Sequence, residues 1–405
     1  MEKIRGILPY FLIIISLSIL FYTLYKSEVY WSGTKRDYYL TLIIVTVLIL
    51  IFSIGLIFLS ENIQKSLINL ILLSVLILYI FEAYLTFIKP KQLIEYKNKQ
   101  KLKKEILYEK QNKKKYDNRS VIEIFDDLNK TNKNIKIKSN PYLYKSFKGD
   151  VFTLSGISNS KTIFCNEKGS YAIYESDRYG FNNPDNQWDK GVIDYMLIGD
   201  SFAQGFCVDR PFDIASVLRE KYKKNVLTIG FSGNGPLTEY ASFREYYQKN
   251  VKKLLWIYYE GNDLNELNTE YKINILKKYI EDTNFKQNLK NRQKELDKLA
   301  ISRMENDIMN NRNIEYEYNI NFNLISFIRL YELKKFIYPM KEKPNFLILK
   351  KILESVKKET SINNTELYFV YLPEYSRYKR KYDNTNYLQI KQILKNLNIN
   401  FVDVH

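Results

Sequence analysis

The sequence predicts an α/β protein in which three N-terminal transmembrane helices precede a doubly wound parallel sheet. Two observations lead to this fold class. Within residues 1–90 lie three apolar runs of about 20 residues, the length at which a helix crosses a bilayer core. From residue 191 onward, short apolar runs alternate with amphipathic segments. This alternation is typical of parallel strands with helices on both faces of the sheet.

The apolar runs are Ile7–Tyr25, Tyr39–Leu59 and Leu67–Ile88, and we expect residues 1–90 to form a three-helix transmembrane region. A cleaved signal peptide is the alternative for the first run, but no small-residue cleavage site follows it and two more runs do. Glu82 lies near the end of the third run. We interpret it as a boundary residue that reaches the interface, rather than as part of an ion pathway.

The net charge of +17 favours either nucleic acid or an anionic membrane surface as a partner. Lysine is abundant along the whole chain, and no basic stripe adjoins a known nucleic-acid-binding motif. We therefore expect contact with a lipid bilayer and none with nucleic acid. The positive-inside rule gives conflicting indications for the orientation of the chain in the membrane. Lys3 and Arg5 favour a cytoplasmic N-terminus, whereas eleven lysines between Lys89 and Lys115 favour a cytoplasmic large domain.

Residues 91–150 predict a basic helical stalk or linker, in which Ser120 begins a short helix with a buried stripe. Residues 141–190 predict hairpins and loops, and residues 151–405 the large domain. Its predicted strands are Tyr195–Ile198, Val226–Ile229, Leu254–Tyr259, Leu367–Leu372 and Phe401–Val404. Its predicted helices are Phe212–Tyr222, Leu237–Lys249, Phe346–Lys358 and Tyr387–Leu397. A helical insertion at about 264–344 is either a lid or, as we favour, a structural excursion.

The ends of three predicted strands carry groups suited to acyl transfer. Ser201 follows the first strand and opens a helix, where backbone N–H groups and the helix dipole stabilise a negative oxygen. Gly233 follows the second strand in a glycine-rich turn, and Asn262 follows the third. Since the carboxyl ends of parallel strands meet at one edge, the sequence predicts a nucleophile with two further oxyanion donors. No metal and no cofactor are expected, because the chain lacks a familiar ligand set and a phosphate-binding loop.

With these three blocks, Gly199-Asp-Ser201, Gly230-Phe-Ser-Gly233 and Gly261-Asn262-Asp263, the chain resembles the SGNH hydrolase superfamily, also called the GDSL family. The resemblance covers roughly residues 150–405. It is greatest to membrane-tethered bacterial members, because Ser176-Asp-Arg-Tyr-Gly-Phe-Asn-Asn183 is similar to their sequence before the nucleophile. It implies a flavodoxin-like sheet, Ser201 as nucleophile, and an oxyanion hole formed by the N–H groups of Ser201 and Gly233 and the Asn262 side chain. Thr228 departs from the asparagine often found in the second block.

The fourth element of the family, an Asp-x-x-His motif that supplies the base and its orienting acid, has no match. The chain ends Phe401-Val-Asp403-Val-His405, with one residue between acid and histidine instead of two. His405 is the only histidine. We therefore expect the chain to stop before its catalytic base, with His405 an ordinary residue at a strand end; an unusual Asp403–His405 pair is the alternative.

The resemblance implies a membrane-anchored serine esterase or O-acyltransferase acting on ester groups, notably O-acetyl groups, of cell-envelope glycans. The alternative is a non-catalytic SGNH-like protein that binds a glycan or a protein partner. We expect a multi-pass protein of the bacterial inner membrane with the large domain outside the cytoplasm. Cys165 and Cys207 fit a disulfide in an oxidising compartment, although two buried reduced cysteines fit the sequence nearly as well.

Overall fold

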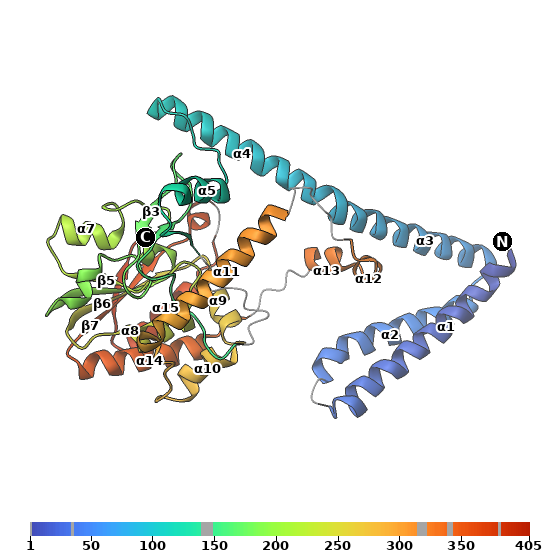
Figure 1. Cartoon of the computed structure of the whole chain (residues 1–405). Helices are drawn as coiled ribbons and strands as arrows, with labels where there is room; N and C mark the ends of the chain where they lie inside the picture. The colour runs from blue at the N-terminus through green and yellow to red at the C-terminus, as the bar shows by residue number, and fades with distance from the viewer. Residues whose placement is uncertain (1, 34–35, 139–148, 314–321, 338–342, 380–381) are drawn as a thin grey trace. The chain divides into compact units, whose positions relative to one another are not determined.

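The computed structural model of the chain describes residues 2–33, 36–138, 149–313, 322–337, 343–379 and 382–405 (Figure 1). These residues belong to two compact units. The first unit contains Met1–Lys97 and Asn319–Met340, and the second contains Asn98–Tyr318 and Lys341–His405. The chain therefore passes between the two units at three places.

Long apolar helices make up most of the first unit. They are α1 (Glu2–Leu24) with the π-helical turn η1 (Tyr25–Tyr30), α2 (Arg36–Ile57), and α3 (Glu61–Ala83) with its continuation η2 (Tyr84–Ile88). The same helix continues as α4 (Lys89–Asn112), which is rich in lysine and passes from the first unit into the second after Lys97. Stretches long and apolar enough to cross a membrane lie at Pro9–Tyr30, Tyr39–Ile57 and within Asn62–Asn112. The three predicted membrane helices are thereby confirmed by length and composition. Two short helices, α12 (Leu324–Ile328) and α13 (Tyr331–Ile337), complete the unit.

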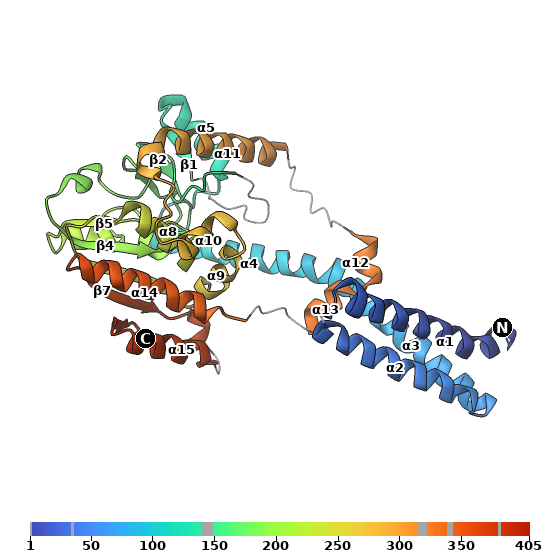
Figure 2. The same ribbon diagram turned by 90° about the horizontal axis from the view of Figure 1, so that it is seen from below.

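Helices α1 and α2 lie side by side (Figure 2), and each carries small polar residues that are buried. Ser16, Thr46 and Ser53 are each almost fully buried. Thr46 donates its hydroxyl to the Leu42 carbonyl at 2.6 Å, and Ser53 donates to the carbonyl one turn before it at 2.7 Å. The hydroxyl protons of Thr46 and Ser53 are thus hydrogen-bonded within α2. Small side chains let helix backbones approach closely in lipid, so this pair is suited to a bilayer.

The second unit begins with a small sheet in the order β1-β2-β3, formed by Ile135–Ile137, Lys161–Ile163 and Ile173–Glu175. Helix α5 (Val121–Thr131) packs on this sheet through Ile124, which shares a buried cluster with one isoleucine of β1 and one of β2. The helix starts, as predicted, at Ser120, whose side chain accepts the Glu123 N–H in a capping box. Since α5 and β1 belong to this compact unit, its structure starts before the predicted boundary at residue 151.

A five-stranded parallel sheet forms the centre of the second unit. Its order is β5-β4-β6-β7-β8, where the strands are β4 (Ile193–Gly199), β5 (Val226–Thr228), β6 (Val251–Tyr259), β7 (Glu366–Leu372) and β8 (Asn400–Asp403). Every neighbouring pair is parallel. All five predicted strands are thus confirmed to within a few residues. The chain runs from β4 to one neighbour, β5, and then across to the other, β6, so the carboxyl end of β4 is a topological switch point.

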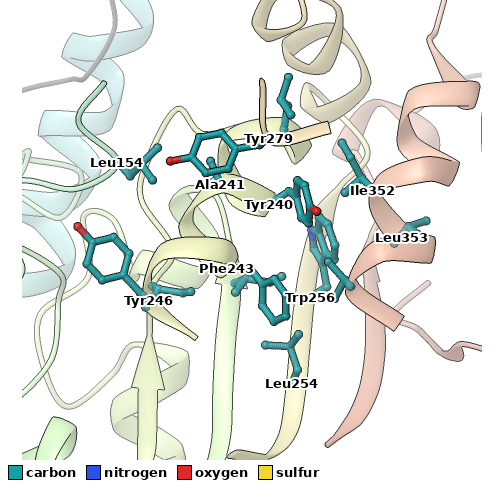
Figure 3. Packing of buried hydrophobic residues seen from close by; sticks show 14 of the residues in the cluster. Leu154, Tyr240, Ala241, Phe243, Tyr246, Leu254, Trp256, Tyr279, Ile352 and Leu353 are labelled. Carbon is teal, nitrogen blue, oxygen red and sulfur yellow. The ribbon is translucent and has the colours of Figure 1, made fainter. Parts of the chain in front are cut away.

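Helices cover both faces of this sheet. The predicted helices are confirmed as α7 (Ile214–Glu220), α8 (Pro236–Tyr246), α14 (Phe346–Ile362) and α15 (Thr385–Asn396). Alternation along each strand divides the core, because successive side chains point to opposite faces. Trp256 of β6 lies in the large cluster with Tyr240 of α8 and Leu353 of α14 (Figure 3). Leu197 of β4 belongs instead to a separate cluster with Ala215 of α7.

The predicted insertion at 264–344 divides between the two units. Its first part forms α9 (Asp263–Glu270), α10 (Asn274–Glu281), the 3-10 turn η5 (Leu289–Arg292) and α11 (Gln293–Asn313). Leu267, Tyr279 and Leu289 are fully buried in the core of the second unit. This first part of the insertion therefore contributes core residues to the second unit. The described residues 322–337 belong to the first unit, a placement that the sequence analysis missed.

Candidate active site at the carboxyl ends of the strands

Ser201 lies on the sharp turn between β4 and α6 (Ser201–Gln204), at the switch point of the sheet. Asp200, which is buried, caps this short helix by accepting the Phe202 N–H through Oδ1 at 2.9 Å. The Ser201 hydroxyl donates to Asp200 Oδ2 at 3.3 Å. The serine is partly exposed, so it can meet a substrate while its hydroxyl already has a proton acceptor.

The second block is held directly against α6, the helix that Ser201 begins. Ser232 donates its N–H to Gln204 Oε1 at 2.8 Å, which ties the turn to the end of α6. A Cβ on Gly230 would stand 2.4 Å from the Ala203 Cβ, so only glycine allows this approach. Gly233 has φ +87°, a left-handed conformation that glycine adopts without strain. The loop that carries the predicted Gly233 donor is thus fixed next to α6.

Thr228 at the end of β5 connects the second block to α6. Its Oγ1 donates to the Ala203 carbonyl at 2.7 Å and accepts the Gly230 N–H at 3.2 Å. One hydroxyl therefore joins the end of β5, the glycine of the second block and α6. Thr228 thus connects the first and second blocks.

The third block brings Asn262 to the same place. Asn262 is the residue before α9, and Asp263 next to it accepts the Tyr259 N–H at 2.8 Å, which closes the turn after β6. Hydrogen bonding by the Asn262 side chain lowers the pKa of both Asp200 and Glu266, against a larger opposite effect of burial. Its Oδ1 is buried and has no partner among the described residues. Asn262 and Ser201 therefore share Asp200 as a neighbour.

Five carboxyl groups are gathered around these blocks, and the sequence analysis did not single them out. Burial raises the pKa of Asp200 and Glu270, and it raises that of Glu266 to about 8. For Glu239 and Asp263, burial raises the pKa further, and the neighbouring carboxylates add to the effect. Like charges this close cannot all ionise. Burial and the neighbouring carboxylates therefore both favour the protonated form in this cluster.

Two of these carboxyl groups connect α8 to neighbouring elements. Glu270 accepts the N–H groups of Gly235 at 2.6 Å, Leu237 at 2.9 Å and Thr238 at 3.2 Å, so it satisfies the first turn of α8. Glu239 of α8 accepts the indole N–H of Trp256, a residue of the central strand β6, at 2.6 Å. These contacts fix the start of α8, which follows the Gly233 turn.

The segment Ser176–Asn183 is hydrogen-bonded to both the first and the second block. Asn182 donates to the Gln204 carbonyl at 2.8 Å, at the end of α6. Asn183 donates to the Thr228 carbonyl at 2.8 Å and accepts the Thr228 N–H at 2.9 Å. Asn183 also donates to Asp177, whose pKa is raised to about 6 by burial despite such hydrogen bonds. The segment is therefore a structural brace of the site.

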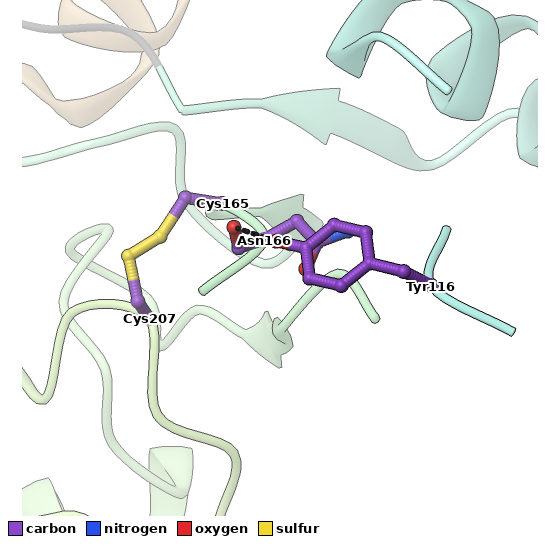
Figure 4. The surroundings of a disulfide bond; sticks show 4 residues. All are labelled: Tyr116, Cys165, Asn166 and Cys207. Atoms are coloured by element: carbon purple, nitrogen blue, oxygen red, sulfur yellow. Dashed lines mark hydrogen bonds between the residues drawn. A yellow bond between two sulfur atoms is a disulfide. The ribbon is translucent and has the colours of Figure 1, made fainter. Parts of the chain in front are cut away.

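A disulfide joins Cys207, which follows α6, to Cys165 in the segment between β2 and β3 (Figure 4). Their Cα atoms are 5.3 Å apart. On the other side of this segment, Tyr116 donates its hydroxyl to the Asn166 carbonyl at 3.2 Å. Glu167 and the two cysteines approach within 4.8 Å, but the disulfide uses both sulfurs, so this group offers no thiolate to a metal.

His405 does not join Ser201 in the structure. His405 lies just after β8 and contacts Asp403, the last residue of that strand. Asp403 also accepts the Tyr387 hydroxyl at 2.6 Å. Hydrogen bonds from Tyr387 and His405 lower the pKa of Asp403 although burial opposes them. Since β8 is three strand spacings from β4, these ends are about 14 Å apart. The His405 ring contacts the Asp403 carboxylate, so the two form an acid–imidazole pair at this end of the sheet.

Comparison of the sequence with models of known protein families and with curated proteins found no match. The description of the site therefore depends on its own geometry. Of the predicted residues, Ser201 and Asn262 share a neighbour, and Gly233 lies in a loop tied to α6. The carboxyl groups were missed because acids on α8 and α9 have the spacing of an ordinary helix face. Only the fold shows that they point inward.

Proposed function

We propose that this chain is a membrane-anchored serine esterase or O-acyltransferase that acts on ester groups, chiefly O-acetyl groups, of cell-envelope glycans. The observation that carries the proposal is the position of Ser201 on the turn after β4, with the second and third blocks on the neighbouring strands. The strand order, 2-1-3-4-5 counted along the chain, also supports a flavodoxin-like SGNH fold. The substrate class comes from the resemblance alone.

In the proposed reaction, Ser201 Oγ attacks the ester carbonyl carbon and loses its proton to a base. The carbonyl oxygen becomes an oxyanion, for which the N–H groups of Ser201 and Gly233 and the Asn262 side chain are the proposed donors. The ester C–O bond then breaks, and the leaving alcohol takes a proton. Water or a sugar hydroxyl attacks the acyl-serine and restores Ser201. The choice between these acceptors separates an esterase from a transferase.

Two groups are candidates for the base. Asp200 Oδ2 lies 3.3 Å from Ser201 Oγ, and its raised pKa makes it a stronger base than an ordinary carboxylate. His405 has an orienting acid in Asp403, but its strand end is about 14 Å from that of β4. Of these two, Asp200 is the one within reach of the serine hydroxyl.

The position of His405 favours the second candidate function, a non-catalytic SGNH-like domain that binds a glycan or a protein partner. The separation between β4 and β8 is the specific observation behind this alternative. Binding alone requires neither a base nor a nucleophile. The intact turn around Ser201 and the donors around it favour catalysis instead.

The test is hydrolysis of p-nitrophenyl acetate by the full chain in detergent, with labelling of the serine by a fluorophosphonate probe. We expect Ser201→Ala to lower the rate by about 10³-fold or more and to abolish labelling, as for other nucleophilic serines. Ser355→Ala on α14 is the control, because its exposed hydroxyl bonds only one turn back, to the Lys351 carbonyl. Equal rates for wild type and Ser201→Ala would reject catalysis in favour of binding.

A second measurement separates the two enzyme classes. The protein is incubated with an activated acetyl ester and an unacetylated envelope glycan. An acetylated glycan would indicate transfer, and release of acetate without acetylated glycan would indicate hydrolysis.

We also propose that the large domain lies outside the cytoplasm of a bacterial inner membrane. Three spans separate the N-terminus from the large domain. The Cys165–Cys207 disulfide supports an oxidising compartment, since such bonds are rare in the cytoplasm.

A further inference from the structure

The described residues 322–337 pack against the end of the third membrane helix, within the first unit. Tyr79 of α3 donates its hydroxyl to the Ile328 carbonyl at 2.9 Å, and its ring lies 5.8 Å from that of Phe327. Phe87 in η2 lies 6.3 Å from the same phenylalanine, and the rings of Phe81 and Phe336 are 5.6 Å apart. Both α12 and α13 thus contact the third span through aromatic rings (Figures 1 and 2).

Glu82 fixes α13 at this position. Its carboxylate accepts the Glu332 N–H at 2.9 Å and the Leu333 N–H at 2.7 Å, in the first turn of α13. Glu82 is almost fully buried, and Leu333 is buried with it. A buried carboxylate needs such donors, and the first turn of a helix has unpaired N–H groups that need an acceptor. Glu82 therefore joins the third span to α13 through two backbone N–H groups.

These two helices expose several large apolar side chains. Leu324, Ile325, Ile328, Tyr331 and Ile337 are all exposed, and they lie beside the exposed apolar side chains of a membrane-spanning helix. Tyr84 and Lys89, where the third span ends, are residue types that anchor helices at the interface. Arg329, Lys334 and Lys335 are exposed on the same short helices or next to them. Apolar and basic side chains together are typical of segments that lie in the headgroup region.

We propose that α12 and α13 form an interfacial membrane element, whose exposed apolar side chains are immersed in the bilayer at the boundary between headgroups and acyl chains. Lipid is the occupant because this surface continues the lipid-facing surface of the third span. The basic side chains would contact anionic headgroups. The inference is independent of any catalytic activity. It gives the insertion a role: the chain of the large unit returns to the membrane between α11 and α14.

The experiment places one fluorescent label at a time on the full chain in vesicles of phosphatidylethanolamine and phosphatidylglycerol. Both native cysteines are in the disulfide, so an introduced cysteine is the one free thiol. Ile325→Cys tests the element. Ile77→Cys on α3 is the lipid-exposed reference, and Ile362→Cys at the end of α14 is the aqueous reference. The three isoleucines are 60%, 55% and 71% exposed, so each substitution is tolerated and each label is accessible.

We expect the label at Ile325 to show blue-shifted emission, strong quenching by nitroxide on the lipid acyl chains, and protection from aqueous iodide. Its depth should be shallower than that at Ile77, about 5–10 Å below the headgroups. The label at Ile362 should show the opposite response to both quenchers. Equal quenching at Ile325 and Ile362, whether strong or weak, would overturn the proposal, because the element would then have no preference for lipid.

Discussion

Around Ser201, a neutral amide is placed among acids. Asn262 interacts with Asp200 on one side and Glu266 on the other, and its Oδ1 has no partner among the described residues. A carboxamide can donate two hydrogen bonds and carries no charge. It can therefore support a developing oxyanion without adding to the desolvation cost of the site. The carboxyl groups nearby are compatible with an oxyanion only while they are protonated.

Replacing Asn262 tests this role directly. We expect Asn262→Ala to lower kcat for p-nitrophenyl acetate by about 10²–10³-fold with little change in KM, which is typical of one lost oxyanion donor. Asn265→Ala is the matched control, because this asparagine lies exposed on the same helix, α9. A loss confined to KM would show that Asn262 contributes to substrate binding instead.

The raised pKa of Glu266 makes the stability of the fold depend on pH. In the folded chain its pKa is about 8, against 4.5 for an ordinary glutamate, so the folded state binds one more proton between these values. The contribution of Glu266 to the stability of the fold is therefore complete below about pH 4.5, and it is lost as the pH rises toward 8. We expect Glu266→Gln to reduce this fall, measured as the thermal unfolding midpoint in detergent at pH 5 and pH 8. An equally steep fall in the variant would assign it to Asp200, Glu239, Asp263 and Glu270, whose pKa values are raised in the same direction.

At the scale of elements, the site depends on a turn that contributes no reacting group. The turn containing Asn182 and Asn183 bonds to the end of α6 and to β5, so it sets the distance between the first and second blocks. Arg219 of α7 donates to Asn183 Oδ1 at 2.6 Å, which adds a third element to the same brace. Such a brace keeps the nucleophile and the proposed donors in register.

We expect Asn183→Ala to destabilise the large unit by about 1–3 kcal/mol, because it leaves the buried N–H and carbonyl of Thr228 without partners. Asn186→Ala is the control, since Asn186 is exposed in the 3-10 turn η4 (Asp185–Asp189). Urea unfolding followed by tryptophan fluorescence measures both, with Trp188 and Trp256 buried as reporters. Equal midpoints for Asn183→Ala and the control would refute the brace.

Element by element, the sequence predicted the parallel sheet well, because period-two burial and short apolar runs mark strands such as β4 and β7 directly. It also marked Ser201, since a strand, a turn and a helix start are local features. It missed Glu266 and Glu270, whose inward direction depends on how α9 packs against α8. It missed the grouping of residues 322–337 with the first unit for a related reason. An amphipathic pattern such as Leu324–Ile328 is the same for a helix on a protein core and one on lipid.

At the scale of the whole molecule, the disulfide and the membrane helices constrain one another. Cys207 follows α6, and Cys165 lies 42 residues before Cys207. The disulfide therefore forms within the large unit. The three candidate spans precede that unit in the chain, and α12 and α13 return to the membrane unit without adding a span among the described residues. With three crossings, an oxidising compartment for the large unit would require a cytoplasmic N-terminus. The lysines of α4, which favour the opposite orientation, are then the departure from the positive-inside rule.

Fusions of alkaline phosphatase, which is active only outside the cytoplasm, test this orientation. We expect fusions after Gly33 and after Asp150 to be active and a fusion after Ser60 to be inactive, because successive spans alternate the side of the membrane. A green fluorescent reporter at the same three positions should give the reverse pattern. If the fusion after Asp150 is inactive and the one after Ser60 active, the large unit is cytoplasmic. A glycan of the cell envelope would then be out of its reach, and the eleven lysines between Lys89 and Lys115 would have decided the orientation.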